Sequence, residues 1–184
     1  MKIALVVILM LILTLTGCTG ERENDVQPTY TGPTISDELQ NDWHKTTISK
    51  VESIVGYNLP IPAYIPSDYE VKEVYYHQVA NSNPPSTDIL LLISDQNVKW
   101  IGTTFTCRIA LLIGWNHAGL GLKMPWARHI PEINGRLEEK EGEYALWWET
   151  YGSPESLGST LILRASQQFS VDEMIKIAAS TPAN

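Results

Sequence analysis

Apolar residues fill positions 3–13, are scarce from 19 to 33, and then return in short periodic runs. Runs with strand character, either alternating or continuously apolar, cover residues 69–78, 88–94, 98–106, 108–115, 143–150 and 159–166. Helical spacing of apolar residues appears only before and after these runs. Because the strands follow one another without intervening helices, the pattern predicts an α+β fold. We expect a mainly antiparallel sheet of five to seven strands, with an N-terminal and a C-terminal helix on one face.

The first helix is predicted from about Ser36 to Val55. Ser36 is a favoured N-cap residue, and the acidic residues that follow it suit the positive end of a helix. At steps of three and four, one face of this helix carries Leu39, Trp43, Thr47, Val51 and the pair Ile54 and Val55. Gly56 follows as the residue that ends the helix.

The last helix is predicted at residues 170–180. Ser170 and Glu173 have the spacing of a capping box, in which each residue satisfies a free backbone N–H of the first turn. Phe169 and Met174 flank this box as a hydrophobic staple. We expect the helix to end before Thr181, which a proline follows.

Three further segments are predicted as connections. Residues 57–69 contain three prolines in seven positions, which excludes a helix and a central strand and favours an extended segment laid on the core. Residues 114–133 are irregular and are predicted as a long loop, or a loop with a short strand. Residues 138–142 are highly charged and are predicted as a turn.

The N-terminus has the pattern of an exported protein. Lys2 precedes the apolar run, which is shorter than the roughly 20 residues that span a membrane. Leu15-Thr16-Gly17-Cys18 resembles the lipobox of bacterial lipoproteins. That resemblance implies a diacylglycerol on the Cys18 thiol, cleavage before Cys18, and a chain attached by lipid to the cell membrane and facing outside the cytoplasm.

The domain organisation follows from this reading. Residues 1–17 are predicted to be a lipoprotein signal peptide. Residues 18–34 comprise the lipidated cysteine and a polar, flexible tether that is too hydrophilic to fold. Residues 35–181 are predicted to form a single globular α+β domain, which is an ordinary length for one domain.

Charge and cysteine content narrow the range of possible functions. Removing residues 1–17 removes Lys2, which leaves 12 basic and 21 acidic residues and a net charge of −9. This acidity argues against a nucleic-acid partner, because phosphate binding needs a basic face. If Cys18 carries lipid, Cys107 alone remains and no intramolecular disulfide forms. Cys107 lies in a strand-like run, which favours a buried, unreactive thiol.

The chain contains none of the sequence motifs that mark common catalytic sites. There is no glycine-rich phosphate loop, G-x-S-x-G turn, C-x-x-C pair or H-E-x-x-H motif. We therefore expect no enzyme, no cofactor and no metal. His117, His129 and Glu132 share the irregular segment and leave an envelope hydrolase as an alternative, although solvated or structural histidines explain them more simply.

The tryptophans are the candidate ligand-binding residues, because tryptophan is enriched at binding surfaces. The four candidates are Trp115, Trp126, Trp147 and Trp148. Trp147 and Trp148 are adjacent on a strand and must point to opposite faces. A tryptophan-rich core is the simpler explanation of these residues, and a groove for an apolar or lipid ligand is the functional alternative.

The segment VGYNLPIPAYIPSDYEVKEVYY, residues 55–76, resembles the start of an extracytoplasmic domain of unknown function. That family occurs in anti-sigma-factor-like, sporulation-related and lipoprotein sequences and carries the motif P-x-Y-L-P-x-G-Y. Here Pro62, Tyr64, Ile65, Pro66 and Tyr69 match it, and Asp68 replaces the usual glycine. Residues 169–180, FSVDEMIKIAAS, resemble the end of the family's domain. The resemblance implies a curved antiparallel sheet and no known activity.

Together these features predict a membrane-anchored extracytoplasmic lipoprotein that acts as a non-enzymatic binding or sensing module. The expected partners are the membrane, through the N-terminal lipid, and an envelope protein or an apolar ligand.

Overall fold

The structure is a computed structural model that describes the following parts of the chain: residues 43–79, 85–98, 100–101, 104–105, 107–115, 125–140, 142–150 and 158–182. For residues 100–101, 104–105 and 115 it describes the backbone alone. The predicted signal peptide at 1–17, Cys18 with the tether at 18–34, and Ser36 and Leu39 of the predicted first helix lie outside the described residues.

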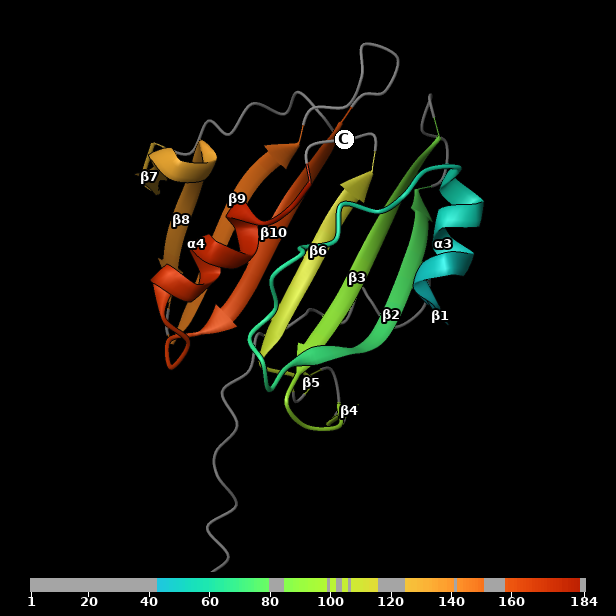
Figure 1. Ribbon diagram of the computed structural model, residues 1–184, viewed down its shortest axis with the longest axis horizontal. Helices are drawn as coiled ribbons and strands as arrows, with labels where there is room; N and C mark the ends of the chain where they lie inside the picture. The colour runs from blue at the N-terminus through green and yellow to red at the C-terminus, as the bar shows by residue number, and fades with distance from the viewer. Residues whose placement is uncertain are drawn as a thin grey trace, which may run out of the picture.

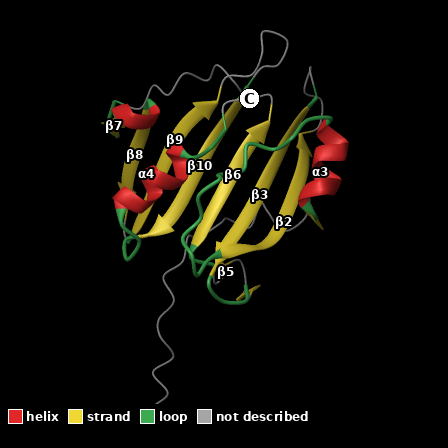
Figure 2. Cartoon of the chain, viewed as in Figure 1, coloured by secondary structure: helices red, strands yellow, loops and turns green. Residues whose placement is uncertain are grey.

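Eight strands of the described chain form one antiparallel sheet in the order β1-β2-β3-β6-β10-β9-β8-β7 (Figures 1 and 2). Their bounds are β1 His44–Thr46, β2 Glu70–Val79, β3 Ser86–Ser94, β6 Ile109–Trp115, β7 Arg128–Ile130, β8 Gly135–Lys140, β9 Glu143–Thr150 and β10 Ser159–Ser166. The helices are α3 Ile48–Val55, the single 3-10 turn η1 Pro131–Ile133, and α4 Val171–Ala179. The α+β class with an open, curved sheet is confirmed, and the predicted five to seven strands were too few.

The sheet consists of two four-stranded meanders joined at its centre. One contains β1, β2, β3 and β6, and the other contains β7, β8, β9 and β10. In each meander a short helix, α3 or η1, follows the first strand. The last strands of the two meanders, β6 and β10, pair with each other, with Leu111 opposite Leu163 and Ile113 opposite Leu161. The two halves therefore share one central pair of strands.

One face of the sheet carries the main core. Fully buried side chains on this face include Leu91 of β3, Leu111 of β6 and Leu163 of β10. Helix α3 contributes Val51 to the same cluster, and α4 contributes Met174, Ile177 and Ala178. Both helices thus cover one face, as predicted. Within the described residues, neither helix is long and apolar enough to cross a membrane.

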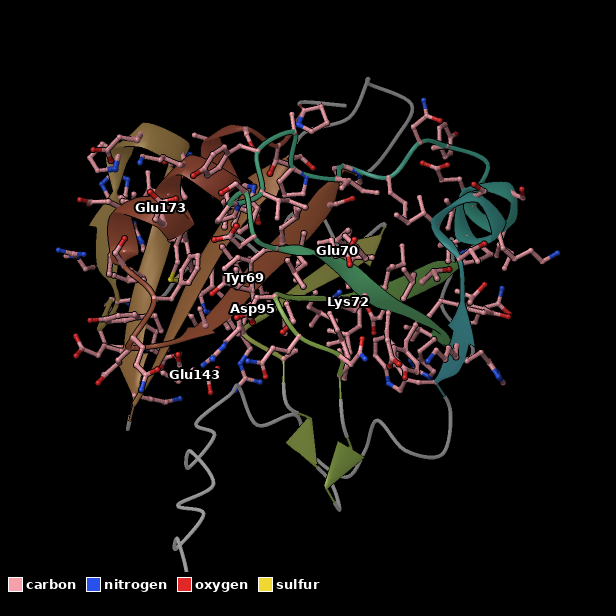
Figure 3. The ribbon with its side chains drawn as sticks, turned by 60° about the horizontal axis from the view of Figure 1, so that its bottom comes forward. Tyr69, Glu70, Lys72, Asp95, Glu143 and Glu173 are labelled. Atoms are coloured by element: carbon pink, nitrogen blue, oxygen red, sulfur yellow. The ribbon has the colours of Figure 1, made fainter. Side chains whose placement is uncertain are left out.

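The segment predicted to be extended, residues 57–69, lies on this core and runs alongside α4. Near the end of α4 the Ala63 N–H donates to the Ser180 carbonyl at 3.1 Å, and the Tyr64 N–H donates to the Ser180 hydroxyl at 2.9 Å. Near the start of α4 the ring of Tyr69, which Figure 3 labels, meets Phe169 edge-on, with ring centroids 5.8 Å apart. The segment therefore holds α4 at both ends.

Helix α4 begins as predicted. The Ser170 hydroxyl accepts from the Glu173 N–H at 3.1 Å, which confirms the N-cap. The Glu173 carboxylate accepts instead from the Tyr64 hydroxyl and from Lys176, each at 2.6 Å. The hydrogen bond to Glu173 raises the pKa of Tyr64, and Lys176, followed by Tyr64, lowers the pKa of Glu173.

The first helix is shorter than predicted. Thr47 is its N-cap, and Gly56 ends it in the left-handed conformation at φ 80°, as expected. Residues 44–46 form strand β1, in which Lys45 pairs with Tyr75 of β2. Trp43 packs with the smaller cluster on the opposite face, 5.7 Å from the His77 ring. The helical spacing of Trp43 and Thr47 was thus coincidental, because Trp43 precedes the edge strand β1 and Thr47 follows it.

Two strand assignments also need correction. The run 98–106, predicted as one strand, contains the two-residue strands β4 Trp100–Ile101 and β5 Thr104–Phe105, which pair with each other. The charged residues 138–140, predicted as a turn, belong to β8. Strand β8 lies next to the sheet edge, where solvent reaches it, so its charged side chains reflect exposure.

The strand β6 offers a matched test of the two faces. Leu111→Ala removes a fully buried side chain, and we expect it to lower the free energy of unfolding by about 2–5 kcal/mol. Its neighbour Leu112 is half-buried on the opposite face, and Leu112→Ala is expected to cost less than about 2 kcal/mol. Urea denaturation of both variants measures the difference. Equal losses would contradict the assignment of the main core to the helix-covered face.

Candidate functional site

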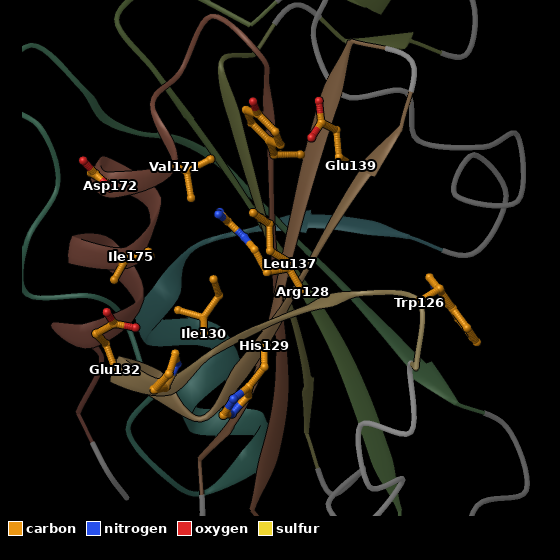
Figure 4. Close-up of a pocket in the computed structure, with 12 residues that line it drawn as sticks. Trp126, Arg128, His129, Ile130, Glu132, Leu137, Glu139, Val171, Asp172 and Ile175 are labelled. Atoms are coloured by element: carbon orange, nitrogen blue, oxygen red, sulfur yellow. The ribbon is translucent and has the colours of Figure 1, made fainter.

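A groove of about 870 Å³ lies between α4 and the edge of the sheet (Figure 4). We call it the α4 groove. Strands β8 and β7 lie beyond α4, so their side chains on the helix-covered face form its floor (Figure 1). The described residues that line it are Trp126, Arg128, His129, Ile130, Pro131, Glu132, Leu137, Glu139, Tyr144, Val171, Asp172 and Ile175.

The turn η1 borders the groove next to α4, and its geometry is set by local sequence. Pro131 opens the turn, and Asn134 closes it in the left-handed conformation at φ 49°. At Gly135 an added Cβ would lie 2.6 Å from the backbone oxygen of Trp147 in β9. Since glycine alone permits this approach, β8 begins directly against β9 and holds η1 close to α4.

The floor of the groove combines apolar side chains with one cation. Ile130 and Leu137 are buried there, and Arg128, paired with Leu137 across β7 and β8, reaches over them toward α4 (Figure 4). Arg128 forms no ion pair or hydrogen bond with any residue that the structure describes. An exposed guanidinium above an apolar floor presents several donors to a ligand.

Carboxylates occupy the rim of the groove. Glu132 lies on η1, Glu139 on β8 and Asp172 in the first turn of α4 (Figure 4). Glu139 accepts a hydrogen bond from the Gln167 side chain at 3.0 Å. The groove therefore offers both an exposed cation on its floor and negative charge around its opening.

The candidate tryptophans do not gather in one groove. Trp147 and Trp148 point to opposite faces, as predicted: Trp148 is 3% exposed in the main core, and Trp147 is half-buried on the other face. Trp126 is 69% exposed at the mouth of the α4 groove, to the side of the floor (Figure 4). The side chain of Trp115 lies outside the described part of the chain.

The histidine candidates are similarly divided. His129 and Glu132 both line the α4 groove, but alternation along β7 places His129 on the opposite side of the strand from Arg128 and Ile130 (Figure 4). His117 is not among the described residues. Across the described ranges, no three His, Cys, Asp or Glu side chains lie close enough to hold a metal ion.

Cys107 is completely buried, as predicted. It packs with Leu90, Leu92 and Ala110 in the smaller cluster of the opposite face. Burial raises the pKa of its thiol to about 12, and a backbone hydrogen bond and the charge of Arg164 offset this only partly. A nucleophilic role requires the thiolate, so this environment keeps Cys107 unreactive.

Sequence reasoning missed the groove itself. Arg128 stands in a segment predicted as a loop, and Val171 and Ile175 belong to a helix about 45 residues later. The pairing of β7 with β8 and the seating of α4 over β9 bring them together, and no sequence spacing signals that contact. Only Trp126 and the pair His129 and Glu132 had been considered as site residues.

The burial of Cys107 predicts its chemical behaviour. At pH 8 the thiolate fraction should be about a thousandfold lower in the folded protein than in the unfolded chain. We therefore expect iodoacetamide to modify Cys107 rapidly in guanidinium and hardly at all without it, as measured by mass spectrometry over time. Fast modification of the folded protein would contradict the buried environment.

No protein-family model, curated protein or solved structure matches this chain.

Proposed function

We propose that this protein is a lipid-anchored, extracytoplasmic binding module that acts without catalysis, and that the α4 groove is its binding surface. The observation that carries the proposal is the exposed Arg128, which has no ion-pair or hydrogen-bond partner among the described residues, on the apolar floor of a groove of about 870 Å³. Ligand sites have volumes of roughly 300–1,000 Å³ and combine apolar walls with a few polar groups that fix orientation. The α4 groove has a volume within this range and an apolar floor at Ile130 and Leu137, while charged side chains make up much of its rim.

The chemistry of the groove favours a protein segment as the ligand. The Arg128 guanidinium suits a carboxylate or a backbone carbonyl, and Ile130 and Leu137 beneath it suit an apolar side chain. The rim carboxylates of Glu132, Glu139 and Asp172 suit basic side chains. A peptide chain presents all three kinds of group at short intervals, whereas a lipid chain would leave these charged groups without partners.

The alternative of an apolar or lipid carrier has less support. It required a groove lined by several tryptophans, and Trp126, Trp147 and Trp148 lie in three separate surroundings. We therefore favour a segment of an envelope protein as the ligand of the α4 groove. The mature charge of −9 agrees with a partner that is recognised by local chemistry and not by general attraction to anionic lipid.

The proposed lipid anchor is inferred from the lipobox, and it can be tested separately from the groove. We expect full-length protein expressed in bacteria to incorporate a clickable palmitate analogue, and Cys18→Ala to abolish that labelling and release the protein from the membrane fraction. Cys107→Ala is the matched control, because it removes the other cysteine and should leave labelling intact. Labelling that persists in Cys18→Ala would overturn the proposed anchor.

The groove is tested by site-specific cross-linking in native membranes. We expect a photo-reactive phenylalanine derivative at position 171, inside the groove, to form a discrete cross-link to an envelope protein. The same group at position 57, on an exposed tyrosine away from the groove, should not form it. Arg128→Glu should reduce the yield by at least about tenfold, because it reverses the charge on the floor.

The matched control for that charge reversal is Arg136→Glu. Arg136 lies on β8 but points to the opposite face, where it pairs with Trp147. Its reversal should leave the cross-link unchanged. Equal losses in the two variants would indicate a general effect of charge and would contradict the α4 groove as the binding surface.

A further inference from the structure

A second pocket, of about 250 Å³, lies on the face of the sheet opposite the main core. We call it the Ala145 pocket. The described residues that line it are Leu112, Glu138, Lys140, Glu143, Ala145, Trp147, Ile162 and Arg164. It shares no residue with the α4 groove, which lies on the helix-covered face.

The pocket exists because a small side chain is surrounded by large ones. Ala145 of β9 lies directly opposite Glu138 of β8 and Arg164 of β10. Glu143 and Trp147 are two residues away from Ala145 along β9, so their side chains lie on the same face. All four neighbours line the pocket and extend beyond the single methyl group of Ala145. The register of the sheet therefore leaves a depression at this position.

One side of the pocket is apolar. Trp147 lies opposite Ile162, which lies opposite Leu112, so these three side chains form one row across β9, β10 and β6. All three are half-buried, and part of each reaches solvent. The indole N–H of Trp147 is buried, so a ligand meets the ring of this residue and not its donor. The pocket is smaller than the roughly 300–1,000 Å³ of drug-sized sites, which suits a single ring.

The charged side chains of the lining are paired with one another. Arg164 and Glu143 form a two-pronged ion pair, in which Nη2 donates to Oε2 at 3.0 Å and Nε donates to Oε1. The Nζ atom of Lys140 lies 2.9 Å from Oε1 of Glu138. These two bases and two acids give the described lining no net charge. A ligand can reach all four side chains, because they are between 17% and 76% exposed.

The paired charges and the apolar row define the class of ligand. A lining without net charge favours a neutral ligand over an anion or a cation. Glu143 accepts from two N–H groups of the Arg164 guanidinium and leaves its other donors for water or a ligand. A purely apolar ligand would cover these donors without pairing them, which costs free energy. The ligand that fits is therefore a ring with an apolar face and hydroxyl groups at its edge.

We propose that the Ala145 pocket binds the pyranose ring of a neutral saccharide. The C–H face of the sugar packs on the Trp147 ring above Ala145, as amphipathic ligands pack on aromatic side chains. A hydroxyl group both accepts and donates, so the sugar accepts from Arg164 and donates to the carboxylates of Glu143 and Glu138. The pocket and the α4 groove lie on opposite faces of the sheet, and each proposal can fail without the other.

The Trp147 indole reports on binding. We would label the full-length chain with ¹⁵N-tryptophan, in micelles of a detergent without a sugar headgroup, and assign the Trp147 resonance by its absence in Trp147→Phe. The neutral probes are glucose, galactose, mannose and N-acetylglucosamine. Glucuronate is the anionic probe, and cyclohexanol is a ring with one hydroxyl.

We expect at least one neutral sugar to shift the Trp147 resonance saturably. It should bind at least about tenfold more tightly than cyclohexanol, which lacks most of the hydroxyl groups, and glucuronate should bind no more tightly than the neutral sugar. The Trp148 resonance should not move, because that side chain is buried on the other face. Tighter binding of a linear tetrasaccharide than of its monosaccharide would assign a glycan chain as the source, and equal binding would assign a free sugar.

Three results would overturn the proposal. A Trp147 resonance that no sugar moves, or that cyclohexanol moves with equal affinity, would mean that the pocket recognises no sugar hydroxyl. Tighter binding of glucuronate than of the neutral sugars would make the pocket an anion site. A shift of Trp148 together with Trp147 would mean that the probes act through the solvent and not in the pocket.

Two substitutions at one position test the location of the site. Ala145→Leu fills the depression, and we expect it to weaken sugar binding at least about tenfold, because a leucine side chain and a sugar ring cannot occupy the same space. Ala145→Ser is the matched control, since it keeps a small side chain and should retain binding. A Trp148 resonance at its original position would show that both variants keep the core. Unchanged affinity in Ala145→Leu would contradict the pocket as the binding site.

A third variant tests the donor at the edge of the pocket. Arg164→Lys keeps the positive charge but loses the planar fork, and we expect it to weaken sugar binding about three- to tenfold, as the loss of one hydrogen bond does. Binding of cyclohexanol, measured in the same way, should change less. An equal loss for both ligands, or no loss for the sugar, would contradict a hydrogen bond between Arg164 and the sugar.

Discussion

The pairing of β6 with β10 is the interaction on which the rest of the structure depends. Each strand is the last of its own meander, so this single ladder unites two halves that are distant in sequence. Leu111 faces Leu163 across it, and both are fully buried in the main core. Because a slip of one residue would turn these side chains to the other face, the burial of the leucines fixes the register of the whole sheet.

The pairing of β6 with β10 also determines where the α4 groove lies. Helix α4 follows β10 directly and packs back over β9, held by the segment that contains Ala63 and Tyr69. A helix of nine residues in that position leaves the floor of β7 and β8 partly open on one side and the end of β9 open on the other. The α4 groove is thus a consequence of one short helix on a wide sheet.

Local patterns predicted the elements whose signals are local. The alternation around Trp147 and Trp148 placed them on opposite faces, and Ser170 and Gly56 marked helix ends that the structure confirms. Two of the misassignments share one cause: charge or helical spacing in strands at or next to a sheet edge resembles a turn or a helix, as for Lys45 in β1 and residues 138–140 in β8. The groove escaped prediction because it depends on contacts between elements that no sequence spacing encodes.

Buried polar side chains mark where the packing of this fold departs from a simple rule. Most buried positions obey a consistent rule, with aliphatic side chains on the helix-covered face from Leu91 to Leu163. The rule breaks at Trp148, Thr150 and Ser159, where buried donors replace groups that would pack without cost. Valine at position 150 would be compatible with the strand and would leave no hydroxyl to satisfy, so stability alone gives no reason for threonine there. This conflict between local preference and burial sets the end of β9 apart from the aliphatic positions of the same face.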